Sequence, residues 1–175
     1  MDKPMSNLGF KMMSFAFIVR DFFKPRRKVI VEVGIKQGDH VLDYGCGPGS
    51  YLKATADLVG PEGKVYALDI HPHAIRKVQK LASKNRLDNV ETILSDCRTD
   101  LPSGSIDVVL LYDTFHALTK PDEALSELYR VLKAGGILSF SDHHLTNDEI
   151  IYGVTVSSLF ELATRGDRTY SFQKA

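Results

Sequence analysis

The feature that most constrains the fold is an alternation of short apolar runs with longer amphipathic stretches from Val41 onward. The runs are rich in Val, Leu and Ile, as in strands that are buried on both faces. The stretches between them repeat apolar residues at helical spacing, so each can cross from one parallel strand to the next. The pattern predicts an α/β fold, a single doubly wound three-layer sandwich around a mostly parallel sheet. After the run at Val41, the expected strands are residues 64–69, 90–94, 106–111 and 136–140.

Local signals mark several element boundaries. Pro121 can open a helix whose apolar residues recur as far as Leu132, and the glycines at 135–136 are expected to end it. The run Thr-Asn-Asp-Glu at 146–149 has the pattern of a capping box that opens another helix. Residues 159–163 and 169–172 flank Arg-Gly-Asp at 165–167 and predict a C-terminal hairpin that adds an antiparallel strand.

Length and composition limit the classes of protein that remain. A chain of 175 residues is long enough for one domain with a continuous core and too short for two catalytic domains. Its 22 basic and 22 acidic residues exclude a nucleic-acid-saturating basic domain. The two cysteines, with no signal-like or membrane-spanning apolar segment, predict free thiols and a cytoplasmic protein.

The loop after the first run carries the strongest ligand-binding signal. Residues 41–49 read VLDYGCGPG and lie between an expected strand and an expected helix. The three glycines let the backbone turn sharply and approach a ligand closely, and the helix N-terminus behind them favours polar or anionic groups. Asp69 ends the second run, where a carboxylate can bind both hydroxyls of a ribose, and Asp96 ends the third. A nucleotide-like ligand is therefore expected at this edge of the sheet.

Together these features resemble the class I S-adenosylmethionine-dependent methyltransferases, over residues 41–140 and through the final hairpin. The resemblance implies a seven-stranded sheet with six parallel strands and a seventh inserted antiparallel. It also implies S-adenosylmethionine as cofactor and, residue by residue, a set of cofactor contacts. The loop around the methionine portion would be Asp43, Gly45, Cys46, Gly47 and Gly49. Asp69 would bind the ribose, Ile70 would pack on the adenine, and Asp96 beside Cys97 would accept from the adenine amino group. Tyr112, after the fourth run, completes the expected cofactor-binding residues.

Other nucleotide-binding loops fit less well. A dinucleotide-dependent oxidoreductase needs a small residue three positions after the second glycine, which Ser50 satisfies only loosely, and it needs room for a second domain. A phosphate-binding loop of the Walker type is excluded, because no glycine is followed by Lys and then Ser or Thr. A cofactor-binding regulatory module without chemistry stays open as the non-enzymatic alternative.

The acceptor side is expected at the ends of the fourth and fifth strands, where titratable residues are concentrated. His116 and His143 are candidate general bases, because a neutral imidazole can accept a proton at physiological pH, and Asp113 is the third candidate catalytic residue. The alternative is that each histidine is an exposed or structural loop residue. No Pro-Pro-aromatic run follows Asp113, which disfavours methylation of DNA amines, so the expected acceptor is a small molecule and not a nucleic acid.

A metal-assisted reaction is the second chemical alternative. Asp113, Asp142 and His143 occupy strand ends where, by resemblance, catechol-type O-methyltransferases place magnesium ligands. A histidine in the third position suits zinc, iron or manganese better than magnesium. Whether a metal is used is left open at this point.

The first thirty residues differ from the rest of the chain. They hold seven basic and two acidic residues, a net charge of +5, and several Phe and Met residues. We predict an N-terminal helical lid or acceptor segment at 1–35 and a methyltransferase core at 36–175. The ordinary interpretation makes residues 24–28 a solvated connection. The alternative is a peripheral membrane contact through residues 11–28 that admits a lipid or quinone acceptor. The acceptor atom and the oligomeric state are not determined by these patterns.

Overall fold

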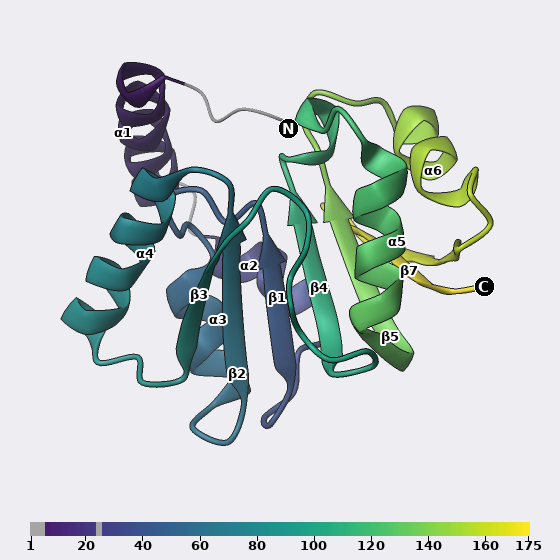
Figure 1. Ribbon diagram of the computed structural model, residues 1–175, viewed down its shortest axis with the longest axis horizontal. Helices are drawn as coiled ribbons and strands as arrows, with labels where there is room; N and C mark the ends of the chain where they lie inside the picture. Colours follow the sequence, from purple (N-terminus) through teal and green to yellow (C-terminus); the bar gives the residue numbers. More distant parts are fainter. Residues whose placement is uncertain (1–5, 24–25) are drawn as a thin grey trace.

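A seven-stranded sheet runs through the centre of the computed structural model, which describes residues 6–23 and 26–175 (Figure 1). The strand order is β3-β2-β1-β4-β5-β7-β6. Neighbours from β3 to β5 pair in parallel, and β7 lies antiparallel between β5 and β6. The predicted fold class is therefore confirmed, including the inserted antiparallel strand. The strands are β1 (His40–Tyr44), β2 (Lys64–Asp69), β3 (Val90–Leu94), β4 (Ile106–Tyr112), β5 (Leu132–Ser141), β6 (Phe160–Arg165) and β7 (Tyr170–Lys174).

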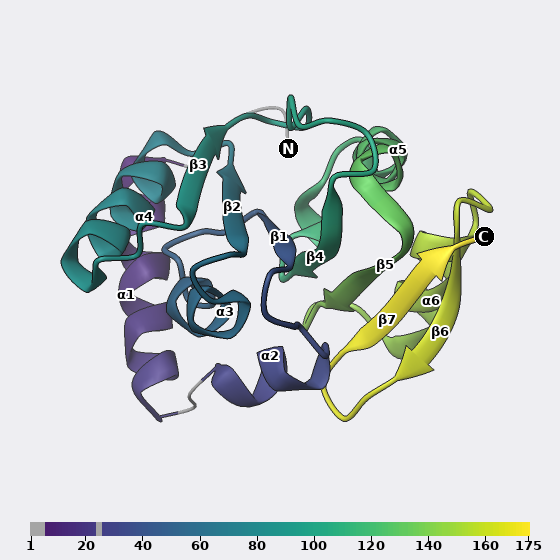
Figure 2. The same ribbon diagram turned by 90° about the horizontal axis from the view of Figure 1, so that it is seen from below.

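Helices cover both faces of the sheet (Figure 2). One core cluster joins α2, α3 and α4 to one face, and a second joins α5 and α6 to the other. The central strands β1 and β4 are buried along almost their whole length, as continuous apolar strands covered on both faces require. The helices are α1 (Asn7–Phe23), α2 (Arg27–Glu32), α3 (Leu52–Val59), α4 (Pro72–Asn85), the 3₁₀ turn η1 (Phe115–Ala117), α5 (Pro121–Val131) and α6 (Asn147–Thr155).

Chain direction places the candidate site. β1 pairs with β2 on one side and with β4 on the other, so the connections that leave these strands diverge at their carboxyl ends. An open α/β sheet binds its ligands in the crevice formed at such a point. The glycine loop follows β1 and the acceptor-side residues follow β4 and β5. The topology therefore brings the two sets of predicted residues to one edge.

Most local predictions are confirmed, with one correction. Thr146 is the N-cap of α6, and its side chain and that of Glu149 form the predicted capping box. The C-terminal hairpin forms as β6 and β7. The predicted end of α5 at the glycines is wrong: the helix ends at Val131, and β5 already begins at Leu132. Gly135 has a φ of +76° and lies within β5, where the register against β4 shifts. The glycines therefore permit a strand irregularity, and they do not stop a helix.

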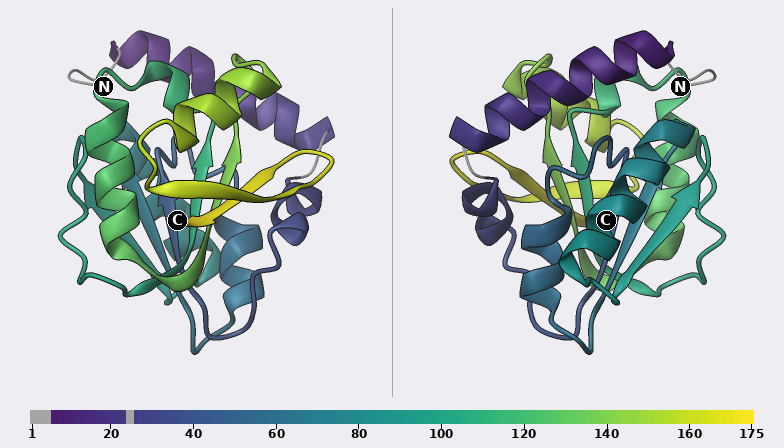
Figure 3. Two further views of the ribbon diagram at one scale, coloured as in Figure 1. Left: turned by 90° about the vertical axis from the view of Figure 1, so that its right-hand side faces the viewer. Right: turned by 90° about the vertical axis from the view of Figure 1, so that its left-hand side faces the viewer.

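The two N-terminal helices differ in their relation to the core. Val29 and Ile30 of α2 are buried in the core cluster that contains β1 and α3. Glu32 accepts hydrogen bonds from the Arg168 backbone N–H at 3.1 Å and the Thr169 hydroxyl at 3.3 Å, which ties α2 to the hairpin turn. α1 lies across the carboxyl-end edge of the sheet (Figure 3). Of the expected connection at residues 24–28, residues 24 and 25 lie outside the described part of the chain.

None of the helices in residues 6–23 and 26–175 combines the length and the apolar character that a bilayer crossing needs.

Candidate active site

A cavity of about 280 Å³ opens at the carboxyl ends of the strands. Its floor is formed by the ends of β1, β2 and β4, and α1 contributes Phe10, Phe17 and Arg20 to its wall. The strand order β2-β1-β4-β5 places the glycine loop and Asp69 toward one end of the cavity, and η1 and the loop after β5 toward the other. The predicted residues that line it are Asp43, Gly45, Cys46, Gly47, Asp69, Ile70, Asp96, Tyr112, Asp113, His116 and His143.

The glycine loop is held against both neighbouring strands. The N–H groups of Gly45 and Cys46 both donate to the Leu68 carbonyl, at 2.8 and 2.9 Å. Gly45 has a φ of +80°, and a Cβ there would overlap the Thr114 hydroxyl. Only glycine therefore lets this loop approach the connection after β4 so closely. Gly49 does not line the cavity; it packs on Val78 and Leu81 of α4.

Asp43, near the carboxyl end of β1, has a buried carboxylate oxygen without a hydrogen-bond partner. Its residue is 3% exposed, and Oδ2 has no hydrogen-bond partner. Burial, and secondarily the charge of Asp69, raise the pKa of Asp43 to about 7. A buried carboxylate without a partner is costly unless a donor or a cation completes it. The chain therefore holds a buried acceptor for a positively charged group at the cavity wall.

Asp69 is fixed in position by backbone donors. Its Oδ2 accepts the N–H of Gly47 at 2.8 Å, and its Oδ1 accepts the N–H of His71 at 2.7 Å. Burial raises the pKa of Asp69, while these two hydrogen bonds lower it. Each carboxylate oxygen keeps a further lone pair that a ligand hydroxyl can use. The geometry suits bidentate recognition of a diol.

The remaining predicted cofactor residues fall into two groups. Ile70 and Asp96 line the cavity, as does Tyr112, whose hydroxyl is buried in a hydrogen bond of 2.7 Å with Ser139. A ligand in the cavity can therefore contact the ring of Tyr112 but not its hydroxyl. Cys97 instead lines a small neighbouring cavity with Tyr44, and its N–H donates to the Ser95 hydroxyl at 3.3 Å.

At the other end of the cavity, two histidines pair with two aspartates across the strands. His116 Nδ1 lies 2.8 Å from Asp142 Oδ2, and His143 Nδ1 lies 2.7 Å from Asp113 Oδ1. The Asp142 side chain is fully buried and also accepts the backbone N–H of His116 and of His144. Because an ionised carboxylate only accepts, each pair places the proton on Nδ1 and leaves Nε2 as the basic nitrogen.

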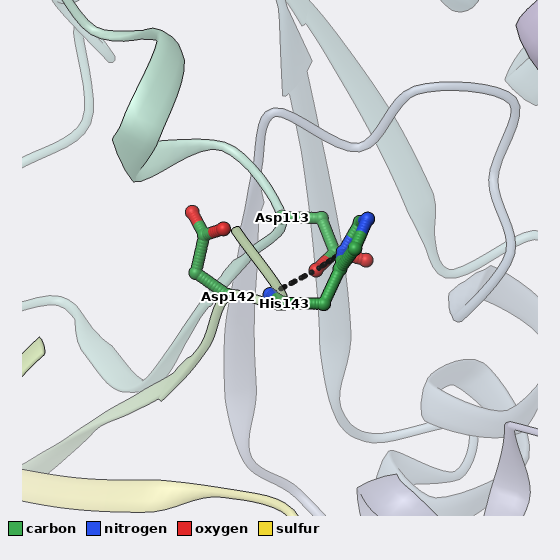
Figure 4. A group of neighbouring side chains, drawn as sticks. All are labelled: Asp113, Asp142 and His143. Atoms are coloured by element: carbon green, nitrogen blue, oxygen red, sulfur yellow. Dashed lines mark hydrogen bonds and ion pairs between the residues drawn. The ribbon is translucent and has the colours of Figure 1, made fainter. Parts of the chain in front are cut away.

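The same aspartates and His143 are close enough to be considered as metal ligands. One ligand atom from each of Asp113, Asp142 and His143 lies within 4.8 Å of the others. In Figure 4 the Asp142 carboxylate points away from the Asp113–His143 pair. The hydrogen bonds to His116 and His144 account for this direction. The side chains are therefore arranged as two hydrogen-bonded His–Asp pairs rather than around one metal position.

Several site residues were missed by sequence reasoning. The ring of His144 lies between those of His116 and His143 in tilted contacts, with centroid distances of 4.1 and 3.9 Å. From α1, Arg20 lies 3.6 Å from Asp113 Oδ2 and 3.4 Å from the Ser50 hydroxyl. Phe10 stacks on His71 at 4.4 Å. The position of His144 beside His143 was a usable signal, whereas the contacts of α1 depend on tertiary packing.

Comparisons with known proteins agree with this arrangement. The family described as "Methyltransferase domain" matches residues 35–173. The chain is 32% identical over 125 residues to the aklanonic acid methyltransferase DauC of Streptomyces sp. (strain C5), covering 69% of this chain and 56% of that protein. It is also 32% identical over 128 residues to the demethylmenaquinone methyltransferase of Geobacillus stearothermophilus, covering 71% and 54%. The chain thus spans little more than half the length of these relatives.

A solved structure extends the likeness to the whole chain. A SAM-dependent methyltransferase from Aquifex aeolicus superimposes with a TM-score of 0.79 and 25% sequence identity, covering 98% of both chains. The family match, the relatives and the seven-stranded topology all agree with the resemblance drawn from the glycine loop and the strand-end aspartates. The chain belongs to the class I S-adenosylmethionine-dependent methyltransferases.

Proposed function

We propose that this protein transfers a methyl group from S-adenosylmethionine to a small, largely apolar acceptor by in-line displacement. One observation carries the proposal: a single cavity is lined at one end by Asp43 and Asp69 and at the other by His116. Donor and acceptor bound at these two ends would meet in one cavity, as a direct transfer requires.

The residues of the donor end fit the cofactor. When bound, S-adenosylmethionine supplies a methyl group that its sulfonium charge already activates. The unpartnered Asp43 Oδ2 would bind the ammonium of the methionine portion, and Asp69 would bind the ribose hydroxyls. Ile70 and Asp96 border the region left for the adenine. These contacts orient the donor and exclude water, which is the main contribution a protein can make to such a displacement.

At the acceptor end, His116 is our candidate for the group that removes the acceptor proton. Its Nδ1 is held by the buried Asp142, so Nε2 is left to accept a proton while the carboxylate stabilises the imidazolium that results. His143, paired with Asp113, is more exposed and is the second candidate. Asp113 acts in this proposal as the orienting partner of His143 and as the contact of Arg20.

The cavity lining and the relatives support our proposal for the acceptor class. Phe17, Ala117 and Leu118 supply apolar surface beside the two histidines, which suits a slender aromatic compound. A curated relative is named as a demethylmenaquinone methyltransferase, and a quinone-like acceptor in its reduced, hydroxyl-bearing form would give His116 a proton to remove. A metal at Asp113, Asp142 and His143 is the alternative form of the same activity, favoured by the proximity of their ligand atoms.

We propose α1 as the lid of this site. It contributes Phe10, Phe17 and Arg20 to the cavity wall, whereas α2 packs into the core. The lid assignment made for residues 1–35 is therefore narrowed to α1. Contact of the N-terminal segment with a membrane would provide a route for an apolar acceptor. The free thiols of Cys46 and Cys97 support a reducing compartment such as the cytoplasm.

The function is tested by incubating the protein with methyl-labelled S-adenosylmethionine and a panel of dithionite-reduced naphthoquinones and simple phenols. We expect label in an organic-extractable product, formed ~10²-fold or more slowly with His116→Gln. Retention of activity in EDTA supports the metal-free form, while loss that Zn²⁺ or Mn²⁺ restores supports the metal-assisted form. Cofactor binding without transfer to any acceptor in the panel would favour the regulatory module.

A further inference from the structure

α1 is apolar on two opposite faces, and only one of them is covered. Phe10 is 3% exposed, Ser14 is buried, and Phe17 lines the cavity, so positions 10, 14 and 17 form the inward face. Leu8, Met12 and Phe15 are 70%, 67% and 69% exposed. Their spacing of four and three residues places them on one side of the helix, opposite the inward face. We call Leu8, Met12 and Phe15 the outer face of α1.

A lid helix needs only its inward face to be apolar. Three large apolar side chains exposed in helical register mark a surface that docks on something else. If this face of α1 met only water, polar side chains could occupy these three positions without loss to the packing of the inward face. The outer face therefore needs a partner with an apolar surface.

The charge around α1 indicates what that partner is. α1 packs on the N-terminal end of α4 through Phe10 and His71, and Lys77 of α4 lies 6.0 Å from the Phe10 ring (Figure 3). α4 carries four basic residues and no acidic residue. Arg76, Lys80 and Lys84 are exposed at intervals of four residues and form one stripe. We call these three residues the basic stripe of α4.

The chain as a whole has no net charge, so a surplus of basic residues on two adjacent helices is a local feature. α1 and α4 together hold six basic residues and one acidic residue, Asp21. Figure 1 shows both helices at one end of the molecule and α6, which begins with the exposed Asp148 and Glu149, at the other. An apolar helix face beside a cationic stripe complements an anionic lipid bilayer, which offers acyl chains and negative headgroups together.

We propose that the outer face of α1 and the basic stripe of α4 dock this protein on an anionic phospholipid membrane. The reason for docking rests on the proposed function: α1, as the lid, would lie in the bilayer surface and admit an apolar acceptor directly from the membrane to the cavity. Docking itself depends only on the surface residues. Compared with the expected contact through residues 11–28, it moves the contact toward the start of α1, to Leu8, Met12 and Phe15, and adds α4, which the sequence patterns did not indicate.

The test is vesicle flotation of the full-length protein. We expect co-flotation with phosphatidylcholine vesicles containing about 30% phosphatidylglycerol, weak association with pure phosphatidylcholine, and release by 0.5 M NaCl. The triple variant Leu8→Ser, Met12→Ser, Phe15→Ser should lower the partition coefficient by roughly tenfold or more, and Lys80→Glu with Lys84→Glu should act similarly. The matched control is Tyr152→Ser with Val156→Ser, an exposed apolar position on α6 and its exposed C-cap residue; this variant should float like the wild type.

Calorimetric titration with S-adenosylmethionine runs beside the flotation. Unchanged cofactor affinity in the triple variant shows that the lid still folds and separates this inference from the proposed function. The inference is overturned by no flotation of the wild type with anionic vesicles, by equal flotation of the triple variant, or by a solution dimer that the triple variant converts to monomers. A labelled RNA duplex bound through the basic stripe, without vesicle binding, also overturns it.

Discussion

His116 and Asp142 lie in the connections after two neighbouring strands. Asp142 Oδ2 accepts a hydrogen bond from His116 Nδ1, and the two atoms are 2.8 Å apart. The aspartate has no exposed side-chain surface, while the histidine reaches the cavity. Parallel pairing of β4 with β5 sets this distance, because Tyr112 and Ser141 stand directly opposite each other just before the two loops. The sheet register therefore positions the candidate base.

His116→Gln should lower turnover by ~10²-fold or more with little change in cofactor affinity, because a proton acceptor is lost and the cavity shape is kept. Asp142→Asn should lower turnover in the same direction, since an amide can hold the other tautomer. Steady-state kinetics with His143→Gln as the comparison identifies the base as the histidine whose loss costs more. Wild-type turnover in both histidine variants would show that neither histidine acts as a base. Catalysis would then come from the positioning of donor and acceptor alone.

Asp69→Ala should weaken S-adenosylmethionine binding by on the order of 1.5–3 kcal/mol for a charge-assisted hydrogen bond. The side chain also orders the glycine loop through Gly47, so Asp69→Asn is measured beside it. Calorimetry gives the affinity, and circular dichroism checks the fold. An unchanged dissociation constant in a folded Asp69→Ala variant would place the ribose elsewhere.

Asp43 should make both cofactor affinity and stability depend on pH. Its pKa is raised from 3.8 to about 7, so the folded protein binds more protons than the unfolded chain between these values. The free energy of unfolding contributed by this group therefore falls as pH rises from about 4 to about 7. Asp43→Asn should remove that loss and raise the melting temperature more at pH 8 than at pH 5.

Binding of an ammonium group needs the ionised form of Asp43. Cofactor affinity should therefore rise between pH 6 and pH 8 in the wild type, with release of protons on binding near pH 7. Titrations in buffers of different ionisation enthalpy measure that release. A pH profile that is the same in Asp43→Asn would show that another group binds the ammonium.

Gly45→Ala should destabilise the protein more than Gly47→Ala. Both glycines have positive φ, so both substitutions strain the backbone by about 1 kcal/mol. Only Gly45 is crowded, by the Thr114 side chain, whereas nothing lies within 4 Å of the Cβ position of Gly47. Chemical denaturation measures the difference, and Thr114→Ala should recover part of the loss in Gly45→Ala. Equal destabilisation would contradict the close approach of the two loops.

The positions that could be predicted are those that follow from local order along one strand and its loop. Asp43, Gly45 and Asp69 end or follow buried strands, and parallel pairing brings such ends together. The pairing of His116 with Asp142 was not predicted, because it depends on the register between β4 and β5 and on the turn at η1. The irregularity at Gly135 was missed for the same reason: a glycine pair after a helix has the same local signal whether it ends the helix or bends the next strand.

The position of α1 could not be derived from its sequence. Its apolar residues recur on both faces, so periodicity alone does not say which face packs. The choice is made by tertiary contacts, the stacking of Phe10 on His71 and the approach of Arg20 to Asp113. Deleting residues 1–23 removes α1 and keeps the buried α2, so we expect a folded core with faster cofactor release, measured by stopped flow. Failure of that truncation to fold would make α1 part of the core.

We propose that the cavity beneath α1 binds S-adenosylmethionine through Asp43 and Asp69. Calorimetric titration at pH 8 with S-adenosylmethionine, S-adenosylhomocysteine and NAD measures this directly. We expect the two methionine-derived ligands to bind with one site each and NAD to bind far more weakly. Tighter binding of NAD, or no binding of either methionine-derived ligand by the folded wild-type protein, would contradict the account.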